Sequence, residues 1–592
     1  MTVFKILDGL VLSLLALVPA VTPTQTPLGP TPTPPLVSLK NGTLAGTHNH
    51  NLNQDFFLGI PYAAPPVGDR RLRRPVPPEP WPGMTRTAYS YRPYCIGTDP
   101  QVPGIGQNIH PAMSEDCLHL NIIRPAGLPP GANLPVLVWI HGGAFKYDSA
   151  ADPRYNGSFL VRNSVGMGTP MIFASVNYRL GVFGMPNGPE VEKAGLENLL
   201  LRDQRQALAW IRENVRAFGG DPSRVTIAGE SAGAASVGYH LLAPDEGLFS
   251  GAIAQSGGPF PSVSLHSEEE REMHFQILLN VTGCTGAEDA LGCLRSVPAE
   301  SLREASLVLP YTMTLDGDLL PDTGSRLLRE GRFVNVPLLI GSTRNDGSST
   351  LQFAMPGPLD THRDFANMVA AVNDNHPLPK STTQKWAELY QQELHDPAAG
   401  LGTVLANPGP EFGAEYGLTS LWLGDAFYAA GRRFANQIWA DYGVPSYSYF
   451  FDVVTANVDA ETLGATHYQE IPFMFGNEDS VGWVVDPFPA DPEVRRRFED
   501  LADVMSRMWI SFVVSGSPNN HQSGLPTSQR HCYLLTECVF LVTDFNVSWP
   551  VYSRADPKNF VFSVAEGNHL QADTWRQEAL QMLIDLADTM KR

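Results

Sequence analysis

The sequence predicts an α/β fold, with a large and mostly parallel central sheet covered by helices on both faces. Two observations predict it. Short apolar runs typical of buried strands occur near residues 136–140, 171–176, 225–228, 251–255, 337–341, 447–451 and 559–564. Long amphipathic patterns typical of helices cover residues 197–217, 492–514 and 571–587. Strands and helices that alternate in this way form parallel sheets with both faces buried.

The first 36 residues differ from the rest of the chain. Lys5 precedes a largely apolar run over residues 9–18, and small residues up to Ala20 suit cleavage, so residues 1–20 are predicted to be a signal peptide. The run is too short to span a bilayer comfortably, and neither a later apolar stretch nor the polar C-terminus indicates a membrane anchor. Residues 21–36 are rich in Pro and Thr and are expected to form a disordered arm. We therefore expect a secreted protein whose folded domain covers residues 37–592.

The predicted strand at 136–140 runs into a glycine-containing loop, His141-Gly142-Gly143-Ala144. Glycines directly after a strand leave backbone N–H groups uncovered, and such groups can stabilise negative charge on a tetrahedral intermediate. A Gly-Gly pair is a weak signal by itself. It gains weight here because it lies upstream of a stronger motif.

That stronger motif is the pentapeptide GESAG at residues 229–233. It follows the apolar run at 225–228 and precedes small residues that suit the start of a helix. A strand, a sharp turn and a helix in this order expose the Ser231 hydroxyl above the sheet edge and aim the Ala232 N–H at a developing oxyanion. The flanking glycines fit because a Cβ at either place would clash in so tight a turn. The sequence therefore predicts a nucleophilic serine.

A serine in such a turn is followed along the chain by an acid and then by a histidine. Asp346 follows the predicted strand at 337–341 in the tripeptide NDG, which is a common turn and would also present the carboxylate. Among the fifteen histidines, His467 is favoured because it lies after the strand-like run at 447–451 and before an apolar segment. Three other histidines lie inside or beside apolar runs and are expected either to pack in the core or to support the residues of the site: His119, His141 and His240.

Further short segments run along nearly the whole chain: FLGIPYA at 57–63, PPVG at 65–68, SEDCLHLN at 114–121, NYRLG at 177–181, DQ at 203–204, ALAWI at 207–211, FGGDP at 218–222, QSG at 255–257 and the segment around His467. Together with GESAG, they resemble the type-B carboxylesterase/lipase family, which includes cholinesterases and secreted fungal lipases. The resemblance implies the α/β-hydrolase fold. It implies site residues in three groups: a catalytic triad of Ser231, Asp346 and His467, oxyanion-hole N–H groups of Gly143, Ala144 and Ala232, and residues that support the histidine, Glu230 and Ser256.

Two positions depart from the pattern of the family. The family acid is usually Glu, and Asp346 is one methylene shorter, so its loop must approach His467 more closely. If Asp346 is not the acid, Glu470 is the next candidate. The usual third glycine of the oxyanion loop is Ala144, which keeps its N–H but turns a methyl group toward the pocket.

Six cysteines suit a secreted protein, and the sequence alone allows fifteen pairings. The resemblance implies the disulfides Cys95–Cys117 and Cys284–Cys293, and leaves Cys532–Cys538 as the third. Four Asn-x-Ser/Thr triplets are candidate glycosylation sites: Asn41, Asn156, Asn280 and Asn546.

Composition narrows the choice of partners. The 592 residues are 43% hydrophobic, which is enough for a large core, and the family segments interleave along the chain, which favours one domain over several. The net charge of −20 disfavours nucleic acids and anionic membranes as partners. The sequence contains neither a nucleotide-binding glycine fingerprint nor a zinc-type Cys/His spacing, so we expect no cofactor and no metal. The oligomeric state stays open.

The sequence predicts a secreted serine carboxylic-ester hydrolase that acts on neutral esters with an apolar acyl part through an acyl-enzyme. Cholinesterases carry a tryptophan inside the first disulfide loop that binds a quaternary ammonium. The only aromatic ring at residues 96–116 is the imidazole of His110, so choline esters are expected to be poor substrates. The three prolines and three glycines of the same loop disfavour the long amphipathic lid of related lipases. A histidine base predicts activity that rises with pH around 6 to 7.

Three alternatives remain. One is an interfacial lipase or sterol esterase of the same family. Another is a non-catalytic adhesion protein, which the complete set of Ser231, Asp346 and His467 disfavours. The third is a biosynthetic acyl-processing enzyme, which the predicted signal peptide disfavours.

Overall fold

The computed structural model describes residues 33–98, 102–105, 112–260, 265–310, 313–373, 378–395, 405, 408–522 and 547–590. Met1–Pro34 and Pro35–Arg592 are separate units, and the second holds all the described helices and strands. The predicted signal peptide, most of the predicted arm, Cys532, Cys538 and Asn546 lie outside the described residues. Leu36, which we assigned to the arm, instead begins strand β1 (Leu36–Leu39), where it pairs with Ala45.

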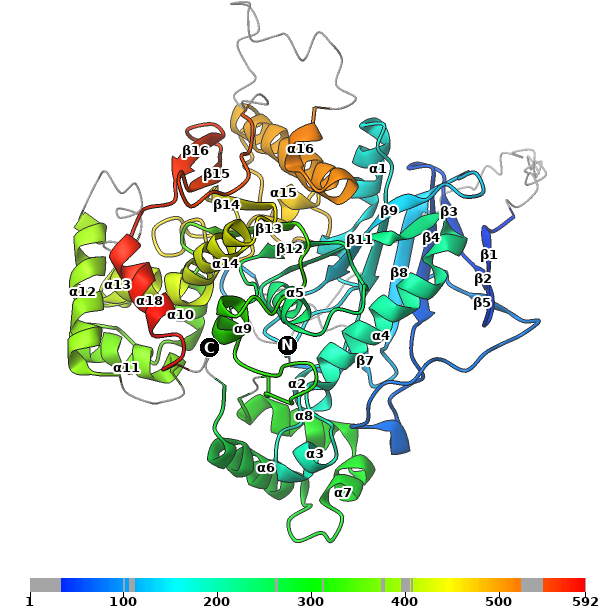
Figure 1. Cartoon of the computed structure of the whole chain (residues 1–592), viewed down its shortest axis with the longest axis horizontal. Helices are drawn as coiled ribbons and strands as arrows, with labels where there is room; N and C mark the ends of the chain where they lie inside the picture. The colour runs from blue at the N-terminus through cyan, green and yellow to red at the C-terminus, as the bar shows by residue number, and fades with distance from the viewer. Residues whose placement is uncertain are drawn as a thin grey trace, which may run out of the picture. The chain divides into compact units, whose positions relative to one another are not determined.

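A large, mostly parallel sheet forms the centre of the second unit (Figure 1), which confirms the predicted fold class. Among the described residues its strand order is β16-β15-β14-β13-β12-β11-β9-β10-β8-β4-β3. All neighbouring strands from β10 to β15 pair in parallel, whereas the outer strands pair antiparallel. The strand bounds are β3 (Thr47–Asn49), β4 (Gln54–Pro61), β8 (His119–Pro125), β9 (Leu134–Ile140), β10 (Ile172–Val176), β11 (Gly220–Glu230), β12 (Gly251–Gln255), β13 (Leu338–Thr343), β14 (Ser446–Asp452), β15 (Lys558–Ser563) and β16 (His569–Ala572).

Two smaller sheets lie at the N-terminal side of the sequence. Strand β1 pairs with β2 (Gly42–Ala45), which also pairs with β5 (Thr85–Thr87). Strand β6 (Tyr94–Cys95) pairs with β7 (Met113–Ser114).

Strand β9 shows why the central strands read as continuous apolar runs. Successive side chains of a strand point to opposite faces of the sheet. Val136, Val138 and Ile140 accordingly join one core cluster, while Leu137 and Trp139 join the other. All five are fully buried. Strands with helices on both faces are largely apolar, with buried exceptions such as Ser446 and Ser448 of β14, and the seven predicted strands correspond to β9 to β15 for this reason.

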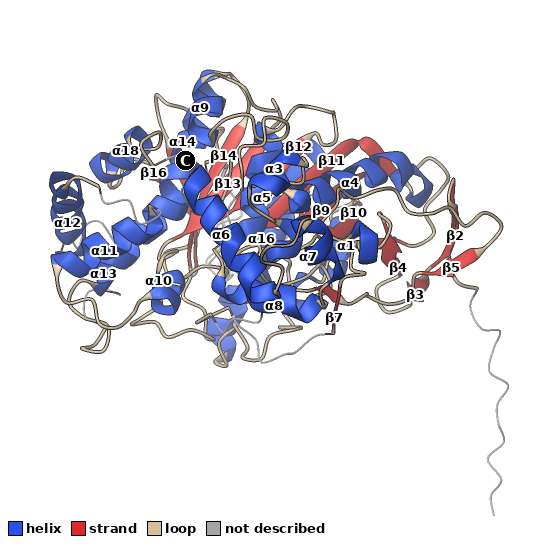
Figure 2. Ribbon diagram, turned by 90° about the horizontal axis from the view of Figure 1, so that it is seen from below, coloured by secondary structure: helices blue, strands red, loops and turns tan. Residues whose placement is uncertain are grey.

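Helices cover both faces of this sheet, as Figures 1 and 2 show. One core cluster is formed with α4 (Leu199–Asn214), α5 (Ala232–Leu242), α9 (Gly324–Arg329) and α14 (Ala430–Asp441). The other is formed with α1 (Ser158–Gly166), α15 (Ile471–Met474) and α16 (Pro492–Ser515). The predicted helices at 197–217 and 492–514 correspond to α4 and α16.

The predicted helix at 571–587 is wrong at its start. Residues 571 and 572 belong to β16, which pairs antiparallel with β15, and the helix α18 covers only Gln577–Asp585. The amphipathic pattern of the segment does not reveal this pairing, because the partner strand is made by a neighbouring segment of chain.

Two groups of helices are inserted after strands β12 and β13. The chain after β12 forms α6, α7 and α8, and the chain after β13 forms α10 to α13 before it returns to the sheet (Figure 1). Both insertions start at the carboxyl ends of parallel strands, which is the edge where open α/β sheets bind ligands. Their bounds are α6 (Glu268–Thr282), α7 (Ala290–Ser296), α8 (Ala299–Val308), α10 (Ser348–Ala354), α11 (His362–Val372), α12 (Lys380–His395) and α13 (Tyr416–Gly424), and two short helices elsewhere are α2 (Gly181–Gly184) and α3 (Pro189–Lys193).

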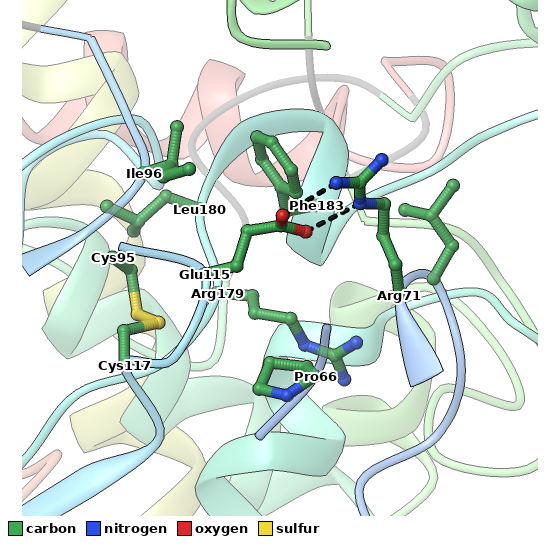
Figure 3. Close-up of a pocket in the computed structure, with 10 residues that line it drawn as sticks. Pro66, Arg71, Cys95, Ile96, Glu115, Cys117, Arg179, Leu180 and Phe183 are labelled. Carbon is green, nitrogen blue, oxygen red and sulfur yellow. Dashed lines mark hydrogen bonds and ion pairs between the residues drawn. A yellow bond between two sulfur atoms is a disulfide. The ribbon is translucent and has the colours of Figure 1, made fainter. Parts of the chain in front are cut away.

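The disulfides Cys95–Cys117 and Cys284–Cys293 both form. Figure 3 shows the first beside the ion pair of Arg71 with Glu115, in which the guanidinium donates two hydrogen bonds of 2.6 Å. Arg71 also donates to the carbonyl groups of Arg295 and Val297, next to α7, which carries Cys293. This arginine therefore ties the two disulfide-bonded regions together. The small pocket around it is largely filled by these contacts, with room of only about 10 Å³.

A buried ion-pair network fixes the C-terminal segment to the sheet. Asp573 lies directly after β16, and Arg432 and Arg433 of α14 donate to its carboxylate at 2.7 and 2.9 Å. Burial alone would raise the pKa of Asp573, but the two guanidinium groups outweigh burial and hold this pKa below its usual value. Removing one partner of a buried pair leaves an uncompensated charge.

We expect Asp573→Ala to lower the free energy of unfolding by about 3–5 kcal/mol, because Arg432 and Arg433 would stay buried without a counter-charge. The pKa of Asp573 is lowered in the folded state. Its contribution to the free energy of unfolding is therefore fully present above the unfolded pKa of about 3.9, and it is lost as the pH falls from there toward the lower pKa of the folded state. Thermal unfolding measures the effect. Glu493→Gln, which removes an exposed ion pair with Arg497, is the control and should change stability by less than about 1 kcal/mol. An equally small change in Asp573→Ala would contradict the assignment.

Candidate active site

Ser231 occupies a strained turn between β11 and α5. Its φ of 56° and ψ of −122° are rare for a residue with a side chain. The flanking glycines are required by close packing, since a Cβ on Gly229 would lie 2.4 Å from the carbonyl carbon of Gly233 and a Cβ on Gly233 would lie 2.1 Å from the Ile140 oxygen. The turn holds Ser231 at the carboxyl edge of the sheet and at the N-terminus of α5.

The glycine loop after β9 runs directly beside this turn. A Cβ on Gly142 would lie 3.2 Å from the Ser231 Cβ, so the loop passes the serine at backbone distance. Gly143 and Ala144 both have positive φ, 87° and 51°. Tyr178 supports the loop by donating its hydroxyl proton to the His141 carbonyl at 2.7 Å. Within the described residues, no acceptor is recorded for the N–H groups of Gly143, Ala144 and Ala232, which leaves these donors available to a ligand.

Asp346 lies in the turn after β13, and both of its carboxylate oxygens are engaged. Oδ2 accepts hydrogen bonds from the Ser256 hydroxyl at 2.8 Å and from the Thr343 N–H at 2.9 Å. Oδ1 lies 2.6 Å from Nδ1 of His467. Ser256 therefore supports the acid directly and the histidine only through it.

The turn of Asp346 packs backbone to backbone against α13, which brings the short aspartate side chain within reach of His467. A Cβ on Gly347 would lie 2.3 Å from the Ser420 oxygen and 2.4 Å from the Gly424 nitrogen. Only glycine fits at Gly347. The close packing at Gly347 lets the loop lie near enough to His467 for the shorter side chain of Asp346 to reach it.

His467 lies in the loop between β14 and α15 and is buried. Its loop is joined to the loop of Asp346 by an isolated bridge between Asn345 and Thr466 and by the Ala465 N–H, which donates to Asn345 Oδ1 at 3.1 Å. His467 Nε2 lies 3.1 Å from Glu230 Oε1, an ion-pair contact. Three further histidines considered from the sequence, His119, His141 and His240, are also buried.

Three buried carboxylates surround the imidazole: Glu230, Asp346 and Glu470. Burial is the largest influence on the pKa of His467 and lowers it, but Glu230 and Asp346 together outweigh burial and raise this pKa to about 9. Burial raises the pKa of Glu230 well above its usual value and that of Glu470 to about 7. The expected apparent pKa of 6 to 7 did not include this upward shift, because the sequence does not show how the carboxylates pack around the ring.

A cavity of about 610 Å³ opens over Ser231 and His467. Much of its wall is apolar: Val102, Ile105, Phe145, Phe260, Leu307, Pro310, Met313, Phe353 and Phe427. The walls come largely from the segment around α8, from α10 and from the turn after α13, so the two helical insertions shape the cavity. Its volume is in the range of sites that enclose drug-sized ligands.

Sequence reasoning missed two residues of this cavity that bear on function. Tyr428 lies flat against His467, with ring centroids 4.8 Å apart and an interplanar angle of 17°. Lys146, two residues after the oxyanion loop, lines the same cavity. Neither lies in a recognisable motif. Lys146 follows the loop so closely that its position beside the cavity could have been inferred, whereas Tyr428 gives no local signal.

In the part of the chain that the structure describes, no group of three or more His, Cys, Asp or Glu side chains is placed to hold a metal ion. No described helix has the length and apolar character needed to cross a membrane.

A mostly parallel sheet with a serine on a strained turn at its carboxyl edge defines an α/β-hydrolase. The model of the Carboxylesterase family matches residues 33–581. The chain belongs to this family, and the protein is a carboxylic ester hydrolase of the serine hydrolase type.

Relatives cover most of the chain. It is 32% identical over 552 residues to acetylcholinesterase from Electrophorus electricus, covering 85% of this chain and 80% of the relative. It is 31% identical over 503 residues to para-nitrobenzyl esterase from Bacillus subtilis, covering 83% and 92%. The crystal structure of EstA from Aspergillus niger superposes with a TM-score of 0.76 at 26% identity, covering 95% of this chain and 99% of that one.

We expect Glu230→Gln to move the acidic limb of the kcat/KM profile to lower pH. Glu230 is the carboxylate whose charge raises the pKa of His467 most, and without it the imidazolium loses its proton more readily. Glu470→Gln is the matched comparison and should shift the limb less, since Glu470 has the weakest effect of the three carboxylates. Rates of ester hydrolysis between pH 4 and 10 measure both. An unchanged limb in Glu230→Gln would show that Glu230 is uncharged during turnover.

Proposed function

We propose that Ser231, Asp346 and His467 hydrolyse carboxylic esters through an acyl-enzyme. The observation that carries the proposal is the 2.6 Å contact between Asp346 Oδ1 and His467 Nδ1. His467 lines the same cavity as Ser231, which lies on the strained turn. The carboxylate keeps the Nδ1 proton on the imidazole, so that Nε2 is left to accept the proton of the serine hydroxyl.

In the described structure His467 Nε2 contacts Glu230 rather than the Ser231 hydroxyl. Contacts of this kind are often looser before the substrate binds than in the reacting complex. The proposed first step therefore includes a small movement of the imidazole from Glu230 toward Ser231. The serine then attacks the ester carbonyl while His467 takes its proton.

The negative charge that forms on the carbonyl oxygen is stabilised by the N–H groups of Gly143, Ala144 and Ala232. His467 returns its proton to the departing alcohol, which leaves the acyl group on Ser231. Water then attacks the acyl-enzyme with His467 as the base, releasing the acid and restoring the serine. No step uses a cofactor or a metal.

The substrate proposed is a neutral ester with an apolar acyl part. The apolar walls of the cavity support it. The lysine at position 146 lines the cavity as well, and a cation there would repel a quaternary ammonium. Together with the absence of a tryptophan at residues 96–116, this supports the proposal that choline esters are poor substrates. An interfacial lipase or sterol esterase is the second candidate, favoured by the exposure of Leu307 and Phe353 at the cavity.

Secretion is part of the proposal. It rests on residues 1–20 as a signal peptide, on the following Pro/Thr-rich residues as an arm that ends before β1, and on the two disulfides of the structure. The sequons in the described part of the chain are at Asn41, Asn156 and Asn280, and none of these three asparagines is buried. They are proposed glycosylation sites.

We expect Asp346→Asn to fold normally and to lose about 10⁴-fold in kcat, because an amide cannot hold the imidazole in the tautomer that leaves Nε2 free. Steady-state kinetics with para-nitrophenyl butyrate measure the loss, and Ser231→Ala sets the background. Glu470→Gln is the control among the neighbouring carboxylates. Near-normal turnover in Asp346→Asn, together with a large loss in Glu470→Gln, would transfer the role of the acid to Glu470.

A substrate panel tests the proposed specificity. We expect a short soluble ester such as para-nitrophenyl butyrate to be turned over well, without a jump in rate when a triglyceride emulsion forms, and butyrylcholine to be hydrolysed slowly. Lys146→Met should narrow the gap between the neutral and the choline ester, because it removes a positive charge from the cavity. A preference of the wild type for butyrylcholine would overturn the specificity, and a jump at the emulsion threshold would favour the interfacial lipase.

A further inference from the structure

Tyr428 contacts the face of His467 that Asp346 and Glu230 leave uncovered. The two rings are nearly parallel, at 17°, and their centroids are 4.8 Å apart. The tyrosine is only 8% exposed, and its side chain is hydrogen-bonded to that of Thr350. Burial raises the pKa of Tyr428 well above its usual value, so the ring stays neutral.

The backbone that carries Tyr428 has an unusual form. It lies in a π-helical turn, η5 (Asp425–Ala429), which links α13 to α14 without a break. Single π-helical turns inside α-helices are rare and frequently mark functional sites. Tyr428 lies within this turn and lines the cavity.

The π-helical turn is anchored from behind. Asp425 accepts hydrogen bonds from Arg576 at 2.6 and 2.7 Å and from the Tyr390 hydroxyl at 2.8 Å, and the side chains of Asp425 and Arg576 are each 2% exposed. Directly before it, Gly424 packs on Gly347, next to Asp346. Asp346, at the edge of the imidazole, and Tyr428, on its face, are therefore carried by two segments that pack against each other at Gly347 and Gly424.

We propose that Tyr428 is a positioning residue for His467, holding the plane of the imidazole and stabilising its cationic form during turnover. The hydrogen bond to Asp346 fixes one atom of the ring but leaves rotation about the Nδ1···Oδ1 line. A flat ring against the face of His467 restricts that rotation, so Nε2 can move between Glu230 and Ser231 without leaving its plane. The electron-rich face of a tyrosine also attracts a cation at this distance.

The proposal extends the triad of the proposed function and rests on it. The charged groups that face the imidazole are Glu230 at the end of β11, Asp346 after β13 and Glu470 before α15. Tyr428 differs from all three in having no charge, so its effect on the histidine is separable from theirs. A tyrosine that merely filled the wall of the cavity would affect the fit of the substrate and not the titration of His467.

The test compares full-length Tyr428→Phe, Tyr428→Leu and Tyr428→Met with the wild type on para-nitrophenyl acetate and butyrate. Tyr428→Phe keeps the ring and should stay within about threefold of the wild-type kcat, since one hydrogen bond is lost. Tyr428→Leu should lose about 10- to 30-fold in kcat with both esters and little in KM, because the attraction of a desolvated ring for a cation is lost. Its acidic limb should move to lower pH, because the imidazolium is less stabilised.

Tyr428→Met fills the space of the ring without its π face and should behave like Tyr428→Leu, which keeps the test valid if the leucine variant does not fold. A change confined to KM that depends on the size of the ester, with kcat and the acidic limb unaltered, would overturn the proposal. So would an equal loss in Tyr428→Phe. The triad is tested independently by the loss of wild-type turnover in Ser231→Ala. Failure of the Tyr428 proposal would therefore leave the proposed function intact.

Discussion

The hydrogen bond between Asp346 and His467 is the contact on which the rest of the site depends. Its partners are 121 residues apart in sequence, and they meet because β13 and β14 are parallel neighbours whose carboxyl ends open at the same edge. An aspartate reaches less far than a glutamate, so the loop that carries it must come closer to the histidine. Gly347 allows this, because it packs on the backbone of α13 where no side chain fits. The insertion after β13 thus helps to set the geometry of the proposed triad as well as covering the cavity.

Local sterics and periodicity made much of this architecture predictable from the sequence. The turn at Ser231 could be predicted from the sequence because its glycines are required by contacts within the turn and with the end of the adjacent strand at Ile140. The central strands were predictable because a strand buried on both faces is largely apolar. The segment at 571–587 was partly misassigned, because only pairing with β15 makes its first residues a strand. Tyr428 could not be found, since it lies in a π-helical turn that no sequence pattern marks and meets His467 only through the tertiary fold.

The buried carboxylates give the site its electrostatic character. Burying Glu230 beside Glu470 and Asp346 is unfavourable when all three are charged, and the imidazolium of His467 offsets part of that cost. In the proposed mechanism, the same charges that stabilise the cation formed during proton transfer would also hold the proton on the resting histidine. Strong stabilisation of the imidazolium therefore opposes easy release of its proton. A neutral ring such as that of Tyr428 can stabilise the cation without adding another negative charge beside it.

The sheet and the insertions contribute different parts of the site: the sheet positions the proposed reacting groups, and the insertions form most of the cavity wall. The sheet fixes Ser231, the N–H donors and the two loops of Asp346 and His467, all within the carboxyl edge. The walls over that edge come mainly from inserted helices, where Leu307 and Phe353 line the cavity although each is more than half exposed. Exposed apolar side chains at the cavity are costly in water unless an apolar group covers them. In the proposed function, an ester with an apolar part would cover them when it binds, and the insertions rather than the sheet would then determine which esters are bound.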